Sequence, residues 1–120
     1  METGATTLYE EYDPEKKGTE HYAMYGDAYG KSLCHAWSAS PIYLLGRYRL
    51  GVKNTGIGYN TFEVAPKRGD LRTFKGTVPL PGGYVTVEVS GDKIEVLPTV
   101  AGGTLVVGDK RYPLEKDCIL

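Results

Sequence analysis

Long apolar runs and dense basic clusters are both missing from this sequence. Its apolar stretches fall short of the ~20 residues that a membrane-crossing helix needs. The first residues lack the basic start and apolar core of a signal peptide. The 14 Lys and Arg are spread along the chain against 15 Asp and Glu, for a net charge of −1. Because nucleic-acid binding needs concentrated positive charge, we expect neither a membrane nor a nucleic acid as a partner, and the cellular location stays open.

Cysteine and histidine are also scarce. Cys34 and Cys118 stand far apart in the chain, which is not the pattern of a disulfide framework. Neither cysteine has a metal-ligand spacing with His21 or His35, and no loop resembles the calcium-binding loop of an EF-hand. We therefore expect two unpaired thiols, no metal and no cofactor.

Short alternating segments occupy the chain after position 51. In YVTVEV, residues 84–89, the three valines share one face. Tight turns follow at Gly91 and Gly108, since glycine tolerates the positive φ of a hairpin. This spacing predicts a mainly β fold, a small antiparallel β-sandwich over residues 52–120. Its candidate strands are 61–64, 71–75, 84–89, 93–96, 104–107 and 111–114.

One convincing helix precedes these strands, in SASPIYLLGRYRLGV. Ser40 can cap its free N–H groups, Pro41 suits the first helical position, and Gly51 suits a left-handed end. Gly46 inside the helix indicates close packing. The helix needs a partner surface, and without one its apolar stripe would drive self-association. That stripe consists of Ile42, Leu44, Leu45 and Tyr48.

Residues 3–31 lack comparable periodicity and are expected to be loops that present side chains. Glu10 and Glu11 are adjacent, so at most one of them faces a given site. His35 can be a hydrogen-bonded structural residue or a catalytic one. Trp37 can fill a core or offer its flat face to a pyranose. Many tyrosines around carboxylates fit carbohydrate chemistry.

Four blocks of the chain, in order, resemble the C-terminal end of bacterial α-L-rhamnosidases, the inverting glycoside hydrolases of family 78. They are GATTLYE at 4–10, YGKSLCHAWSASPIYLLGRYRLGV at 29–52, GYNTFEVAP at 58–66 and KGTVPLPGGYVTVEV at 75–89. The resemblance implies that residues 1–51 are the last loops and last helix of a catalytic (α/α)6 barrel. Residues 52–120 are then the C-terminal β-sandwich, and most of the barrel is absent.

The resemblance also implies roles for particular residues. The glutamate that ends the first block is the family's general base, which corresponds to Glu10. Tyr9 stands where tryptophan is usual and would contact the sugar. The histidine of the HxWSA motif lies in the sugar subsite and corresponds to His35, with Trp37 beside it, although the usual HGW is HAW here. The family's general acid lies earlier in the barrel, and nothing here matches it.

Two functional hypotheses follow, and a related barrel enzyme that acts on another sugar stays open as a third. The chain is a C-terminal fragment of an α-L-rhamnosidase, inactive alone, whose partners are a rhamnose-containing glycoside and the missing barrel domain. Alternatively, it is a freestanding, non-catalytic β-sandwich module that binds carbohydrate or protein. Whether residues 1–50 are ordered in solution discriminates between the two.

Overall fold

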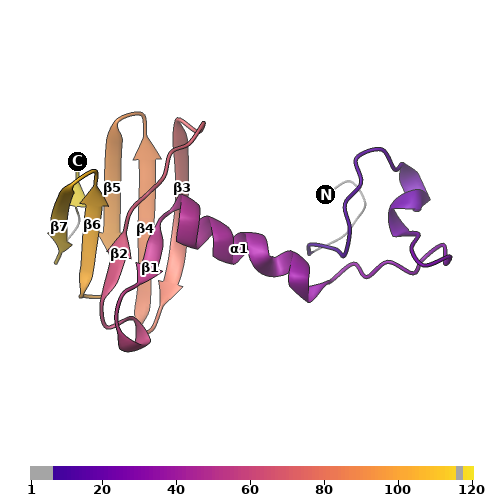
Figure 1. Cartoon of the computed structure of the whole chain (residues 1–120), viewed down its shortest axis with the longest axis horizontal. Helices are drawn as coiled ribbons and strands as arrows, with labels where there is room; N and C mark the ends of the chain where they lie inside the picture. The colour runs from indigo at the N-terminus through magenta and orange to yellow at the C-terminus, as the bar shows by residue number, and fades with distance from the viewer. Residues whose placement is uncertain (1–6, 116–117) are drawn as a thin grey trace. The chain divides into compact units, whose positions relative to one another are not determined.

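The computed structural model describes residues 7–115 and 118–120. The first positions of the GATTLYE block, 4–6, therefore lie outside the described residues. The chain divides into two compact units, Met1–Ile42 and Tyr43–Leu120. The second unit carries the sheets (Figure 1) and includes the last part of the helical segment.

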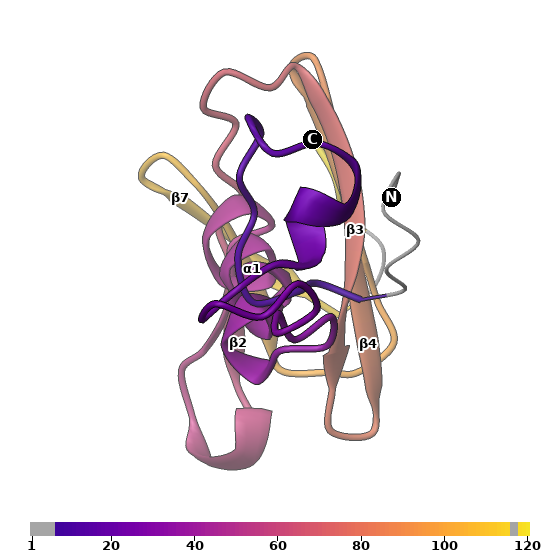
Figure 2. The same cartoon turned by 90° about the vertical axis from the view of Figure 1, so that its right-hand side faces the viewer.

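The second unit is a mainly β structure of two four-stranded sheets. One sheet has the strand order β1-β2-β6-β7 and the other has the order β3-β4-β5-β8. Figure 2 shows β2 and β7 apart from β3 and β4, as two layers. The strand bounds are Val52–Asn54 for β1, Phe62–Val64 for β2, Thr73–Leu80 for β3, Gly83–Ser90 for β4, Lys93–Pro98 for β5, Gly103–Val107 for β6, Lys110–Leu114 for β7 and Cys118–Ile119 for β8.

Valine alternation fixes which face of β4 points inward. Val85, Val87 and Val89 are all fully buried, as their period of two predicts. Two-residue turns join β4 to β5 and β6 to β7, with Gly91 and Gly108 at positive φ. These turns and the β-sandwich are confirmed.

Buried side chains of both sheets form one hydrophobic cluster, which makes the two sheets a sandwich. The first sheet contributes mainly Phe62, Val64 and Leu105, and the second contributes the β4 valines with Val96. Most strand pairs are antiparallel, but β2 and β6 run parallel, with Phe62 opposite Gly103. Strands β1 and β8 were not expected. In β1 the apolar Val52 is followed by two polar residues, and β8 has only two residues, so neither shows a visible alternation.

The helical segment starts earlier than its capping pattern predicted. A 3-10 turn, η2 over Ala36–Ala39, runs directly into α1, Ser40–Leu44, and then into a π-helical turn, η3, Leu45–Arg49. Ser40 already has helical angles, φ −53° and ψ −32°, so it is not the N-cap. The expectation of a cap at Ser40 was wrong, because the preceding residues add a turn before it.

The end of the helical segment follows the prediction. Gly51 has φ +77°, the left-handed conformation that terminates many helices. Gly46 is buried, and a Cβ placed on it would lie 3.3 Å from a methyl of Val78 on β3. The predicted close packing at Gly46 is therefore confirmed.

The apolar stripe of this segment is exposed. Leu50, which follows the last turn of the helical segment, differs from the stripe because it is buried in the sandwich core. The stripe side chains Ile42, Leu44, Leu45 and Tyr48 are 76%, 45%, 57% and 54% exposed.

Candidate functional site

Two stretches of the first unit, distant in sequence, are joined by backbone hydrogen bonds. The Glu10 N–H donates to the Ser32 carbonyl at 2.9 Å, and the His35 N–H donates to the Leu8 carbonyl at 3.2 Å. These bonds bring the carboxylate-bearing end of the first block beside the histidine of the second. Within the described residues, the loop between them contains one short 3-10 helix, η1, Gly18–Tyr22.

The Glu10 carboxylate lies at the centre of this junction. Its side chain is only 7% exposed. The Tyr25 hydroxyl donates to its Oε1 at 2.9 Å, and the Ser32 N–H donates to its Oε2 at 3.2 Å. The His35 Nδ1 lies 3.9 Å from the same Oε2. The carboxylate is therefore held by two donors, with an imidazole beside it.

These contacts stabilise the charged form of Glu10. The Ser32 N–H lowers the pKa of Glu10 most, and the Tyr25 hydroxyl lowers it next. Removal from water acts in the opposite direction, and the charges of His35 and Lys31 add smaller lowering effects. Glu10 is thus ionised near neutral pH and can accept a proton from a bound water.

Glu11 has a different role from its neighbour. Its carboxylate lies 3.2 Å from the Nζ of Lys31, whose side chain is completely buried, and 3.1 Å from the Nζ of Lys16. The Lys31 Nζ also donates to the Glu11 carbonyl at 3.2 Å. Glu11 therefore neutralises a buried cation, while Glu10 faces the tyrosine and histidine. The expectation that adjacent carboxylates face different surroundings is confirmed.

His35 and Trp37 form a ring pair. Their ring centroids lie 4.3 Å apart with an interplanar angle of 40°. Trp37 is 67% exposed, so it does not anchor the start of the helix in a core. Its exposed face is available for stacking.

Tyr9 and Glu10 lie together on a shallow hollow of about 420 Å³. The Tyr9 ring centroid is 6.4 Å from that of Tyr12, and the Tyr9 carbonyl accepts the Ser38 hydroxyl at 2.6 Å. The lining consists of Leu8, Tyr9, Glu10, Tyr12, Ser38, Ser40 and Pro41. Aromatic walls beside a carboxylate suit a sugar ring.

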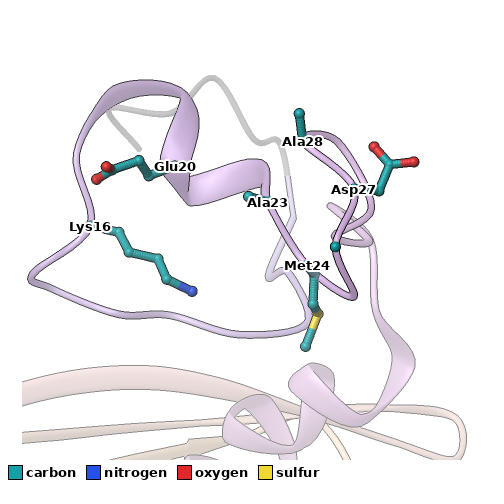
Figure 3. Close-up of a pocket in the computed structure, with 7 residues that line it drawn as sticks. Lys16, Glu20, Ala23, Met24, Asp27 and Ala28 are labelled. Atoms are coloured by element: carbon teal, nitrogen blue, oxygen red, sulfur yellow. The ribbon is translucent and has the colours of Figure 1, made fainter.

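A larger hollow of about 610 Å³ lies in the loop region near Lys16 (Figure 3). Figure 3 shows the carboxylates of Glu20 and Asp27 on opposite sides of it and directed apart. The Lys16 amine is already paired with Glu11. Because its charged groups do not converge, this hollow is a weaker site for acid–base chemistry than the one at Glu10.

Tyr25 and Ser32 are the site residues that the sequence did not reveal. The loop around Tyr25 was expected only to present side chains, and Ser32 acts through its backbone. A tyrosine directly before a turn glycine was the one available signal, and it did not indicate which group the hydroxyl would reach.

Other chemistries lack support in the described part of the chain. Cys34 and Cys118 carry free thiols. Residues 7–115 and 118–120 contain no cluster of three His, Cys, Asp or Glu side chains that could hold a metal. No helix among them is long and apolar enough to cross a membrane.

Comparison with known proteins adds no assignment, since no protein-family model matches the chain and the search of curated proteins finds no match.

Proposed function

We propose that this chain is the C-terminal part of an inverting α-L-rhamnosidase and that Glu10 is the general base. The observation that carries the proposal is the Glu10 carboxylate, ionised, largely buried and fixed between the Tyr25 hydroxyl and the Ser32 N–H. The four blocks of sequence resemblance support the same residue. The exposed apolar stripe of the helical segment fits a helix that packs in a barrel.

The proposed chemistry needs two carboxyl groups. In inverting glycosidases a carboxylic acid protonates the leaving oxygen, and a carboxylate about 6.5–9.5 Å from it activates water on the opposite face. Glu10 takes one proton from that water while the water oxygen forms a bond to the anomeric carbon. The glycosidic bond breaks at the same time, and the acid protonates the leaving oxygen. Each carboxylate oxygen can accept more than one hydrogen bond, so the Tyr25 and Ser32 contacts leave capacity for the water. The missing barrel supplies the acid.

The neighbouring aromatic groups have sugar-binding roles in this proposal. His35 lies next to Glu10 and donates to or accepts from a sugar hydroxyl, while the exposed Trp37 and Tyr9 offer ring faces to the apolar side of rhamnose. No metal or cofactor is required of this chain.

The first test concerns the isolated chain. We expect no hydrolysis of aryl α-L-rhamnosides, because the general acid and most substrate contacts lie outside it. Reading the gene upstream of the Met1 codon then locates the rest of the enzyme. A stop codon there, with residues 1–50 ordered in the isolated chain and weak rhamnose binding, would favour a freestanding β-sandwich module that binds carbohydrate or protein.

The second test is Glu10→Gln in the complete enzyme. Loss of a positioned base should reduce kcat by ~10² or more, with little change in folding because the two residues have nearly the same shape. Glu15→Gln is the matched control, since Glu15 is an exposed glutamate of the same loop region. If Glu10→Gln keeps a near-normal rate while Glu15→Gln does too, Glu10 is not the base.

A further readout separates a base from a merely structural glutamate. With Glu10→Ala, a small anion such as azide can occupy the vacated space and attack the anomeric carbon without needing proton removal. We expect azide to restore turnover and give a rhamnosyl azide of inverted configuration, identified by NMR. An absence of any rescue in a folded variant would count against the assigned role.

A further inference from the structure

A turn in the first unit places a tyrosine in a conformation that tyrosine rarely adopts. Met24 and Asp27 pair across a two-residue turn, each N–H donating to the other's carbonyl at 3.0 Å. The two central residues, Tyr25 and Gly26, have φ of +55° and +82°. Turns with two positive φ values favour Asn, Asp or Gly at both positions, so Tyr25 is the exceptional residue.

Packing does not explain the tyrosine. Tyr25 is 80% exposed, so a hydrophobic core does not require its ring. The left-handed conformation costs a residue with a Cβ about 1–2 kcal/mol. Strained residues of this kind persist where another interaction depends on them, and they concentrate at functional sites.

The interaction that depends on Tyr25 is its hydroxyl contact with the Glu10 Oε1, at 2.9 Å and across 15 positions of sequence. The turn directs the Tyr25 phenol toward the carboxylate, and the backbone hydrogen bonds between Met24 and Asp27 hold the turn in place. The Ser32 N–H holds the other oxygen. The two donors therefore fix both oxygens and hence the plane of the carboxylate.

We infer that Tyr25 is a positioning residue for Glu10. Its left-handed backbone conformation directs the phenol hydroxyl at Oε1 of the carboxylate. The inference rests on the proposed function, since positioning matters only if Glu10 acts on substrate. A fixed carboxylate plane directs a lone pair at the attacking water, and a protonated phenol keeps the base charged until that water arrives.

Several other groups also face Glu10. His35 and Lys31 act on it electrostatically, the Ser32 N–H donates to it, and Glu11 lies close enough to act on Tyr25. Glu10 in turn raises the pKa of Tyr25, which keeps the phenol protonated. Tyr25→Phe removes one donor and leaves all the other groups in place.

The first measurement uses the complete enzyme, in which the barrel surrounds residues 1–50, and requires no turnover. The side-chain carboxyl carbon of Glu10 is followed by NMR against pH in the wild type, in Tyr25→Phe and in the control Tyr29→Phe. Tyr29 is a similarly exposed tyrosine of the same loop. We expect a higher pKa of Glu10 in Tyr25→Phe alone. An unchanged pKa of Glu10 in Tyr25→Phe overturns the inference.

A second pair of variants tests the backbone strain. Asparagine tolerates the left-handed conformation and phenylalanine does not, while both lack the phenol. Protection of the Met24 and Asp27 amides against hydrogen exchange should be roughly tenfold higher in Tyr25→Asn than in Tyr25→Phe, from the cost of that conformation. Equal protection would show that Tyr25 is not strained.

Kinetics of the complete enzyme then test this inference separately from the proposed function on which it rests. Tyr25→Phe should lower kcat roughly tenfold, less than loss of the base itself, and should move the acidic limb of the kcat/KM profile to higher pH. Tyr29→Phe should do neither. If Glu10→Gln leaves turnover intact, the proposed function fails. A raised pKa of Glu10 in Tyr25→Phe would still show that the Tyr25 hydroxyl contacts Glu10. If Glu10→Gln lowers turnover and Tyr25→Phe does not, the positioning role of Tyr25 fails and the proposed function survives.

Discussion

Replacing Gly51 by alanine tests how the helical segment joins the sandwich. Gly51 lies between η3 and β1 with φ +77°. A Cβ on it would clash with the Ala65 carbonyl oxygen. Ala65 cannot retreat freely, because its N–H donates to the Gly51 carbonyl at 3.0 Å and its neighbour Val64 pairs with Val52.

The expected cost of Gly51→Ala has two parts. The left-handed conformation costs about 1–2 kcal/mol for alanine. Relief of the clash breaks at least the Ala65 to Gly51 hydrogen bond, at about 1 kcal/mol or more. We therefore expect a loss of about 2–4 kcal/mol in the free energy of unfolding.

Gly91→Ala is the matched control. Gly91 also has positive φ, +56°, but a Cβ on it would meet no atom within 4 Å. This variant should show only the conformational cost of about 1–2 kcal/mol. The difference between the two variants therefore isolates the close approach of Gly51 to Ala65.

Urea unfolding followed by far-UV circular dichroism provides the measurement, because the strand signal reports on the sheets. Tryptophan fluorescence does not serve here, since the only tryptophan, Trp37, lies outside the sandwich unit. Equal losses for the two variants, within about 0.5 kcal/mol, would refute the reasoning.

Two further predictions concern acid and the core. The pKa values of Glu10 and Glu11 are lowered from 4.5 in the folded chain. The stabilisation that these carboxylates give to the fold is therefore fully present above the unfolded pKa, and it is lost as pH falls through their pKa values in the folded chain. Amide exchange at Ser32, corrected for intrinsic rate, should therefore accelerate in acid, and unchanged protection down to pH ~3 would contradict this. Leu105 is fully buried, so Leu105→Ala should cost about 2–5 kcal/mol. Leu71→Ala, at a residue 43% exposed, should cost far less, and similar losses would argue against this core.

Local features of the sandwich could be predicted from the sequence. The valines of β4 alternate with period two, and this alternation alone assigns their buried face. The turns at Gly91 and Gly108 and the left-handed Gly51 follow from the conformational freedom of glycine. These rules act within a few residues, so they need no knowledge of the rest of the chain.

The start of the helix and the strand pairing could not be predicted in the same way. Ser40 satisfied a capping rule, yet a preceding turn extended the helix past it. The parallel pairing of β2 with β6 joins residues about 40 positions apart, such as Phe62 and Gly103. Local patterns contain no information about which distant strand becomes the neighbour.

The candidate site divides in the same way. The sequence by itself determined that Glu10 and Glu11 point apart and, through resemblance, singled out Glu10 with His35. Only the tertiary structure decided that Lys31 neutralises Glu11 and that Tyr25 and Ser32 hold Glu10. The physical reason is that a side chain's charge and shape are local properties, whereas its hydrogen-bond partners depend on the path that the whole chain takes through space.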